Sequence, residues 1–181
     1  MFLKTTLTLS AALALTACAS NMTAASMPYS QAGLPAAVQV PAGHKVAMET
    51  VGVGQITYEC RAKKDMTGHE WVFAGPDAKL LDRQGRQVGK YYGPPATWES
   101  LDGSKLTATQ LAVAPGAAGS IPLQLVKANP AMGMGAMQGV TYIQRVATQG
   151  GVAPSTVCDA TKAGSREIVG YQADYIFWKA V

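Results

Sequence analysis

Two carboxylates beside a run of aromatic residues are the first candidates for chemistry in this sequence. Glu99 follows Trp98 directly, and Asp102 lies three residues further on. Paired carboxylates can hydrolyse a glycosidic bond when they lie ~5 to 9.5 Å apart. Asp102 also opens the turn Asp102-Gly103-Ser104, where aspartate commonly hydrogen-bonds the turn backbone, and that reading is favoured. We assign no catalytic residue, and keep a hydrolase acting on envelope polysaccharide through Glu99 and Asp102 as an alternative.

The aromatic residues themselves could form a binding platform. Aromatic rings stack on the apolar faces of sugars and give a ligand rigid contact area. The segment Tyr91 to Trp98 contains Gly93, Pro94 and Pro95, so its turn should present rings outward. Core packing is the more common use of such rings in a β protein. The candidate ligand-binding residues are Tyr91, Tyr92, Trp98, Glu99 and Asp102.

Three closely spaced methionines form a second kind of candidate site. Met132, Met134 and Met137 carry soft thioether sulfurs, which select Cu(I). Glycine flanks these positions and no His or Cys joins them, so a flexible apolar loop is the favoured interpretation. We predict no metal site and no cofactor, with a copper-handling protein as the alternative.

Arg145 is a charged residue within an apolar strand sequence. It lies in Val140 to Val146, whose composition is typical of a strand. The guanidinium could hold an anion, or it could form a buried ion pair with Glu59 or Asp174. The structural ion pair is favoured, because a buried charge needs a partner.

The N-terminus contains a lipoprotein-type processing site. Lys4 precedes the apolar run Leu7 to Leu15, and Leu15-Thr16-Ala17 leads directly to Cys18. This predicts a signal peptide over 1–17, lipid attachment at Cys18 and a flexible tether over 18–34. The protein would then bind a membrane through its N-terminal acyl chains. Ala19 resembles the residue that directs bacterial lipoproteins to the outer membrane, so we expect an outer-membrane lipoprotein facing the periplasm; a cleaved, secreted soluble protein is the alternative.

The other two cysteines, Cys60 and Cys158, form an even pair in an exported chain. Such a pair is most simply a disulfide. It would close a loop of 97 intervening residues, for which chain entropy gives about 4.7 kcal/mol. A metal or redox pair is disfavoured because the spacing is not CxxC.

Composition and periodicity predict a β-rich domain over 35–181. The 19 glycines and 10 prolines indicate many turns. Gln55 to Cys60 alternates, with Ile56, Tyr58 and Cys60 on one face, and near the C-terminus Tyr171, Ala173, Tyr175 and Phe177 also share a face. We predict an all-β, single-domain antiparallel β-sandwich, with a closed or partly open β-barrel as the alternative. The net charge of +4 falls to +3 when Lys4 is removed, and the basic residues are scattered, so no nucleic-acid partner is expected.

Several segments, in order along the chain, resemble the family called domain of unknown function 3455. The resemblance covers about residues 35–179, and its pieces are Gly52 to Cys60, Trp71, Pro76 to Leu80, Gly93-Pro94, Thr97 to Glu99, Asp102 to Ser104, Ile121-Pro122, Val140 to Val146, Cys158 to Ala160 and Tyr171 to Phe177. It implies a small exported or lipid-anchored β-rich protein without an established activity. Both Cys60 and Cys158 match family cysteines, which supports the disulfide. The family often has His where Tyr91 or Tyr92 stands here, so no role of that His transfers to this chain.

Together these observations favour a non-enzymatic, lipid-anchored β domain. Its expected partner is a small ligand, a glycan or another component of the cell envelope.

Overall fold

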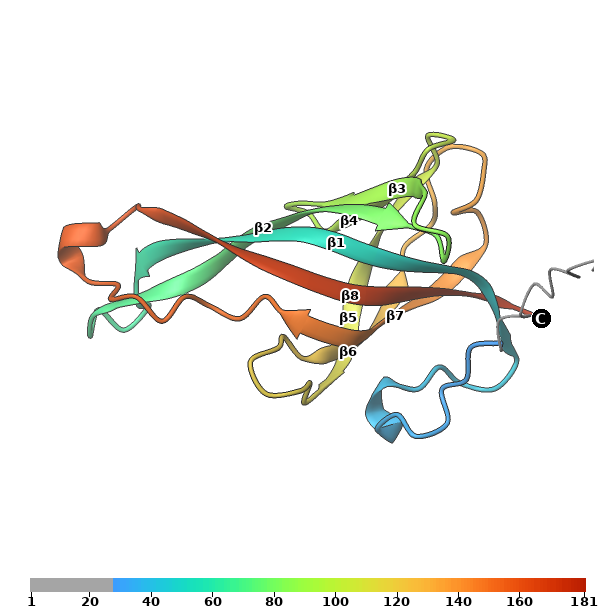
Figure 1. The fold of residues 1–181 in the computed structure, drawn as a ribbon, viewed down its shortest axis with the longest axis horizontal. Coiled ribbons are helices and arrows are strands. Elements are labelled where there is room, and N and C mark those ends of the chain that lie inside the picture. Colours follow the sequence, from blue (N-terminus) through green and yellow to red (C-terminus); the bar gives the residue numbers. More distant parts are fainter. Residues whose placement is uncertain (1–27) are drawn as a thin grey trace, which may run out of the picture.

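The computed structural model describes residues 28–181, and these fold into one antiparallel sheet whose two ends join (Figure 1). Each strand pairs with the next, and the last pairs with the first. The strands are β1 (His44–Ala62), β2 (His69–Leu81), β3 (Gln87–Tyr92), β4 (Thr97–Ser100), β5 (Lys105–Ala114), β6 (Leu123–Ala128), β7 (Val140–Gly150) and β8 (Arg166–Ala180). Two three-residue 3-10 turns, η1 (Ala36–Val38) and η2 (Ala160–Lys162), are the only helical elements of this part of the chain.

The all-β, antiparallel prediction is confirmed. All eight strands belong to a single closed ring, the kind of closure that the sequence left open as an alternative. Side chains that alternate along each strand therefore face either the inside of the ring or its outer surface. Tyr58, Ala173, Tyr175 and Phe177 are buried in the inner core, as the alternation predicted.

Three strands continue beyond the ring as an arm, seen at the left of Figure 1. In the arm β1 pairs with β2 on one side and with β8 on the other. Cys60 and Cys158 form a disulfide there, with their Cα atoms 5.6 Å apart, which confirms the predicted bond. The bond ties the loop before η2 to the arm.

A second, smaller core lies outside the ring. The segment 28–41, which includes η1, lies against the sheet at the lower right of Figure 1. Val38 and Val40 of this segment pack on Ile176 and Trp178, whose side chains face outward from β8. The amide of Gln144 joins the two layers, since its Nε2 donates to the backbone oxygen of Val38 at 2.7 Å. Residues 28–34, which the sequence analysis assigned to a flexible tether, are therefore packed against the sheet instead.

The loop between β6 and β7 closes one end of the ring. Met137 of this loop is fully buried in the inner core. Asp102 holds the loop, because its carboxylate accepts hydrogen bonds from the backbone N–H of Ala136 at 2.8 Å and from the hydroxyl of Ser104 at 2.6 Å. The Ser104 hydroxyl in turn accepts the backbone N–H of Met137. The polar turn at Asp102 and Ser104 thus holds Met137 in the inner core.

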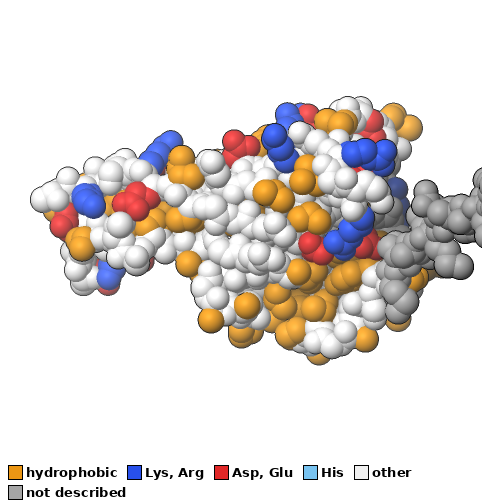
Figure 2. Space-filling model, in the orientation of Figure 1, with side chains coloured by type: hydrophobic (Ala, Val, Ile, Leu, Met, Phe, Trp, Pro, Cys, Tyr) orange, Lys and Arg blue, Asp and Glu red, His pale blue; other side chains and the backbone are white. Residues whose placement is uncertain are grey.

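On one face of the molecule, positive and negative side chains are mixed rather than segregated. On the face drawn in Figure 2, Lys and Arg side chains lie among Asp and Glu side chains. Arg83, for example, bonds both Glu49 and Asp174 on the outside of the ring. In residues 28–181 no helix has the length and apolar character needed to cross a bilayer.

Candidate ligand-binding site

A cavity of about 360 Å³ lies inside the ring. Its lining comes from β2 through β7 and the turn before β4, and the side chains are those that alternation directs inward. Phe73 and Gln110 are exposed at its mouth, so the cavity is open to solvent. The lining residues are Phe73, Tyr91, Ala96, Trp98, Ala108, Gln110, Gln124, Val126 and Arg145. Pockets of this size and mainly apolar character commonly hold small molecules.

Tyr91 and Trp98 form the aromatic wall of this cavity. They are opposite each other in the β3–β4 register, and their rings stack with centroids 4.6 Å apart and planes 24° apart. The expectation that this segment presents all its rings outward is wrong for both, because only 5% of Tyr91 and 2% of Trp98 is exposed. The turn containing Gly93 and Pro94 joins the paired strands β3 and β4. This pairing directs the side chains of Tyr91 and Trp98 into the interior of the closed sheet.

Trp98 also carries a buried donor without a partner. Its Nε1 has no hydrogen-bond acceptor in the described part of the protein. The other two tryptophans are satisfied, since Trp71 donates to the backbone oxygen of Thr156 and Trp178 to Oε1 of Gln144. Buried polar groups are usually hydrogen-bonded, so an unpartnered donor in a cavity wall calls for an explanation.

Arg145 supplies the only charged side chain in the cavity lining. The ion pair expected with Glu59 or Asp174 is not formed: Glu59 pairs with Arg61 and Arg166, and Asp174 pairs with Arg83. The reason is strand geometry, because Glu59 and Asp174 follow inward-facing Tyr58 and Ala173 and so point outward. Arg145 lies opposite Tyr175 and Gln124 in the sheet. Within residues 28–181 its guanidinium hydrogen-bonds only the backbone oxygen of Pro122, through Nε at 3.2 Å and Nη2 at 3.0 Å.

Four inner tyrosines surround the same interior and stay uncharged. Burial raises the pKa of Tyr58, Tyr91, Tyr171 and Tyr175, and the positive charge of Arg145 opposes this only in part. The hydroxyls of Tyr171 and Tyr175 lie 3.3 Å apart, and Tyr58 donates to the backbone oxygen of Gly151. These phenols therefore provide no negative charge that would neutralise Arg145.

Two of the candidate residues face the outside instead. Tyr92 donates a hydrogen bond to Oε2 of Glu99 at 2.6 Å, and Lys90 lies 3.4 Å from the same carboxylate. The hydrogen bond from Tyr92, followed by Lys90, holds the pKa of Glu99 below its usual range. Glu99 is thus part of a polar cluster on the outer surface and takes no part in the cavity.

Asp102 occupies the structural position that the turn motif favoured. Hydrogen bonds from Ser104 and from the backbone of Ala136 lower its pKa to about 2. A glycoside hydrolase needs one carboxyl that stays protonated at neutral pH, which requires a raised pKa. Glu99 and Asp102 both have lowered pKa values, so their environments do not create such an acid.

The three methionines do not share one environment. Met137 is buried in the inner core, whereas Met132 and Met134 are exposed. A three-sulfur copper site would require Met137 to leave that core. Within residues 28–181, no group of three His, Cys, Asp or Glu side chains is placed to hold a metal ion. Cys18 lies outside the described residues.

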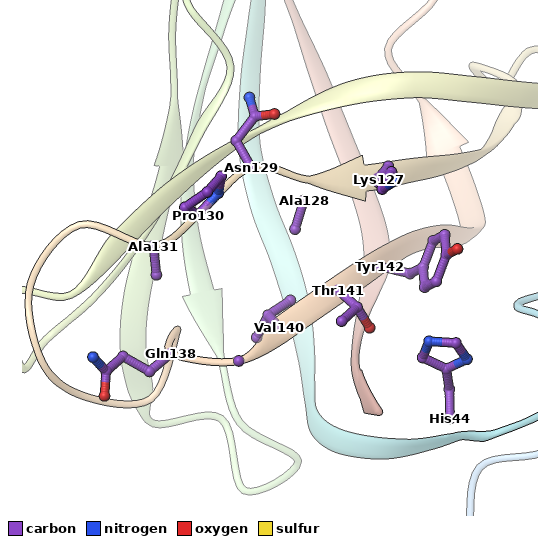
Figure 3. A pocket seen from close by; sticks show the side chains of 11 residues that line it. His44, Lys127, Ala128, Asn129, Pro130, Ala131, Gln138, Val140, Thr141 and Tyr142 are labelled. Atoms are coloured by element: carbon purple, nitrogen blue, oxygen red, sulfur yellow. The ribbon is translucent and has the colours of Figure 1, made fainter. Parts of the chain in front are cut away.

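A second hollow, of about 730 Å³, lies between the end of β6 and the start of β7 (Figure 3). The β6–β7 pairing extends to Lys127 and Tyr142, and the two chain segments diverge beyond it. Ala128, Ala131 and Val140 give the hollow an apolar floor, and the polar rim is formed by His44, Lys127, Asn129, Gln138 and Thr141. His44 packs edge-on against Tyr142 with ring centroids 4.9 Å apart. This groove is broad and open, whereas the inner cavity has defined aromatic and cationic walls.

The sequence identified Tyr91 and Trp98 as candidate ligand-binding residues but gave no sign of most other residues that line the inner cavity. Phe73, Gln110 and Gln124, for example, lie in no recognisable motif. For Arg145 the sequence favours a structural ion pair over an anion site, and one signal indicates its inward position: it lies two residues after Ile143, an inward-facing core residue. Period-two alternation places both on the same face of β7.

One comparison with known proteins found a match. Residues 41–179 match the family model described as protein of unknown function (DUF3455). No curated protein and no solved structure matches the chain.

Proposed function

This chain belongs to the family described as protein of unknown function (DUF3455), and we propose that it is an exported, non-enzymatic binding protein that holds a small molecule inside its ring of strands. One observation carries the proposal. The inner cavity combines a stacked aromatic wall with an arginine that has no acidic partner among the described residues. A few polar groups in a largely apolar cavity are the usual composition of a ligand site.

Binding fits the cavity better than catalysis does. Its lining contains no carboxylate, histidine, cysteine or serine, so it offers neither a nucleophile nor a general base of the common kinds. The tyrosines nearby remain protonated because burial raises their pKa. What these residues can do is to orient a ligand and to exclude water from one side of it.

The location of the protein is part of the same proposal. Cys18 would carry the acyl chains, and the stretch between Cys18 and the packed segment 28–41 would hold the domain beside the outer membrane, facing the periplasm. The Cys18→Ser variant should lose incorporation of labelled palmitate in bacterial cells while still being exported. Equal labelling of both proteins would contradict lipid attachment at this residue.

Binding is tested by the indole N–H signals of the ¹⁵N-labelled protein. The three tryptophans give three signals in different environments, and only Trp98 lines the cavity. The probes are benzamide, benzoate, 1-naphthamide and 1-naphthoate, added to millimolar concentration. At least one should shift the Trp98 signal and leave that of Trp178 in place, since Trp178 lies on the outer face. If no probe shifts Trp98, the proposed function is wrong.

A further inference from the structure

We infer that the ligand of the inner cavity is a planar acid, whose carboxylate binds Arg145 and whose ring packs along the wall formed by Tyr91 and Trp98. This inference rests on the proposed function and adds the chemical class of the ligand. It follows from the hydrogen-bonding capacity of Arg145, from the distribution of acids in the protein, and from the shape of the aromatic wall.

Arg145 has donors to spare. A guanidinium carries five N–H donors in a planar fork. Nε and one N–H of Nη2 are directed to the single backbone oxygen of Pro122, which leaves three donors. Those donors belong to a side chain that lines the cavity. The planar arrangement of N–H groups matches the two oxygens of a carboxylate better than it matches one neutral oxygen.

Five of the eleven acidic residues form ion pairs away from the cavity. Glu59, Asp82 and Glu99 each pair with a lysine or arginine on the outer surface, and Glu49 and Asp174 share Arg83. None of the ion pairs in residues 28–181 includes Arg145. The positive charge of Arg145 is therefore available to attract an anion from solution. The tyrosines around it are uncharged, so they do not neutralise this charge.

The aromatic wall selects for a flat body. The Tyr91–Trp98 pair is nearly parallel, and Tyr175 packs against both rings at centroid distances of 5.1 and 5.9 Å, which fixes their orientation. Ala96 and Ala108 line the cavity beside them with small side chains, so they leave room for a ring. At the mouth, the amide of Gln124 donates to that of Gln110, which adds polar groups without charge.

The experiment compares an acid with its uncharged isostere. Binding of 1-naphthoate and 1-naphthamide is measured by isothermal titration calorimetry on the wild-type protein and on Arg145→Gln. Glutamine retains one donor for the oxygen of Pro122, so it limits structural damage. Arg166→Gln is the matched control, because Arg166 is exposed on the arm and bonds Glu59 rather than lining the cavity. Thermal unfolding of each variant checks that it is folded.

We expect wild type and Arg166→Gln to bind the acid about tenfold more tightly than the amide. Arg145→Gln should bind both probes with the affinity of the amide, because only the charge-assisted bonds are lost. Arg145→Lys, which keeps the charge but not the planar fork, should fall between them.

Two results would overturn the inference. The first leaves the proposed binding function intact, and the second can contradict that function too. If the amide binds as tightly as the acid, and Arg145→Gln changes neither, the cavity binds a ligand but does not select an acid. If neither naphthyl probe binds, the inference is wrong; if, in addition, none of the four probes shifts the Trp98 indole signal, the proposed function is wrong as well.

Discussion

Replacing Gln144 with leucine should release the N-terminal segment from the outside of the ring. The Gln144 side chain is fully buried, and all four of its hydrogen-bonding positions are used. Its Nε2 donates to the backbone oxygen of Val38 and to Gln31, at 2.7 and 3.0 Å. Its Oε1 accepts from Trp178 at 2.9 Å and from Tyr29 at 3.3 Å. Three of these four partners belong to the segment 28–41, so one side chain connects that segment to β7 and β8.

The expected loss of stability follows from these four bonds. A typical hydrogen bond contributes about 1 kcal/mol net, so four contribute about 4 kcal/mol. Leucine has a similar volume and its buried methyl groups recover roughly 1 kcal/mol. We therefore expect Gln144→Leu to lower the free energy of unfolding by about 3 kcal/mol, in part because the Trp178 N–H is left buried without an acceptor.

Urea unfolding followed by tryptophan fluorescence measures this difference. Gln149→Leu is the matched control, since Gln149 lies on the same strand but is exposed. The control should change the unfolding free energy by less than about 0.5 kcal/mol. A loss below about 1 kcal/mol for Gln144→Leu, or equal losses for the two variants, would refute the reasoning that this network fastens the segment.

Two further predictions concern the ends and walls of the ring. The pKa of Asp102 is lowered from its ordinary 3.8 to about 2, so its carboxylate stabilises the fold above about pH 4, and this stabilisation is lost as the pH falls toward 2. Asp102→Asn should therefore have a lower urea midpoint than wild type above pH 4, with the gap closing toward pH 2; a constant gap would contradict the linkage. Gly54→Ala should strongly lower the melting temperature, because a Cβ at Gly54 would lie 2.2 Å from the backbone oxygen of Asp77 on β2. Gly170→Ala, with nothing within 4 Å of its Cβ, should melt close to wild type, and equal melting of the two variants would argue against this packing.

The sequence predicted the strands most reliably where alternation was strict. The period of two in Gln55 to Cys60 placed Ile56 and Tyr58 in the core correctly, and the same pattern did so for Tyr171 to Phe177. The disulfide followed from cysteine number, expected compartment and the family resemblance rather than from geometry. Closure of the ring depends on pairing between β1 and β8, which lie at opposite ends of the domain, and no local pattern encodes that contact.

The candidate site was predictable only in part, because its walls depend on register. Glycine and proline between Tyr91 and Trp98 correctly indicated a turn, but they gave no sign that the two rings face each other across it. Alternation places Arg145 on the inner face of β7, yet the absence of an acidic partner there follows from the outward orientation of Glu59 and Asp174. Such an absence is a property of the assembled sheet, so the sequence favoured an ion pair that the fold does not make.

A crystal structure of the protein with 1-naphthoate bound is the most direct test of the central claim. The account predicts the acid inside the ring, with its carboxylate within hydrogen-bonding distance of the Arg145 guanidinium and its ring against Trp98 and Tyr91. Occupancy of the groove between β6 and β7 alone (Figure 3), or an empty inner cavity at saturating acid, would contradict it.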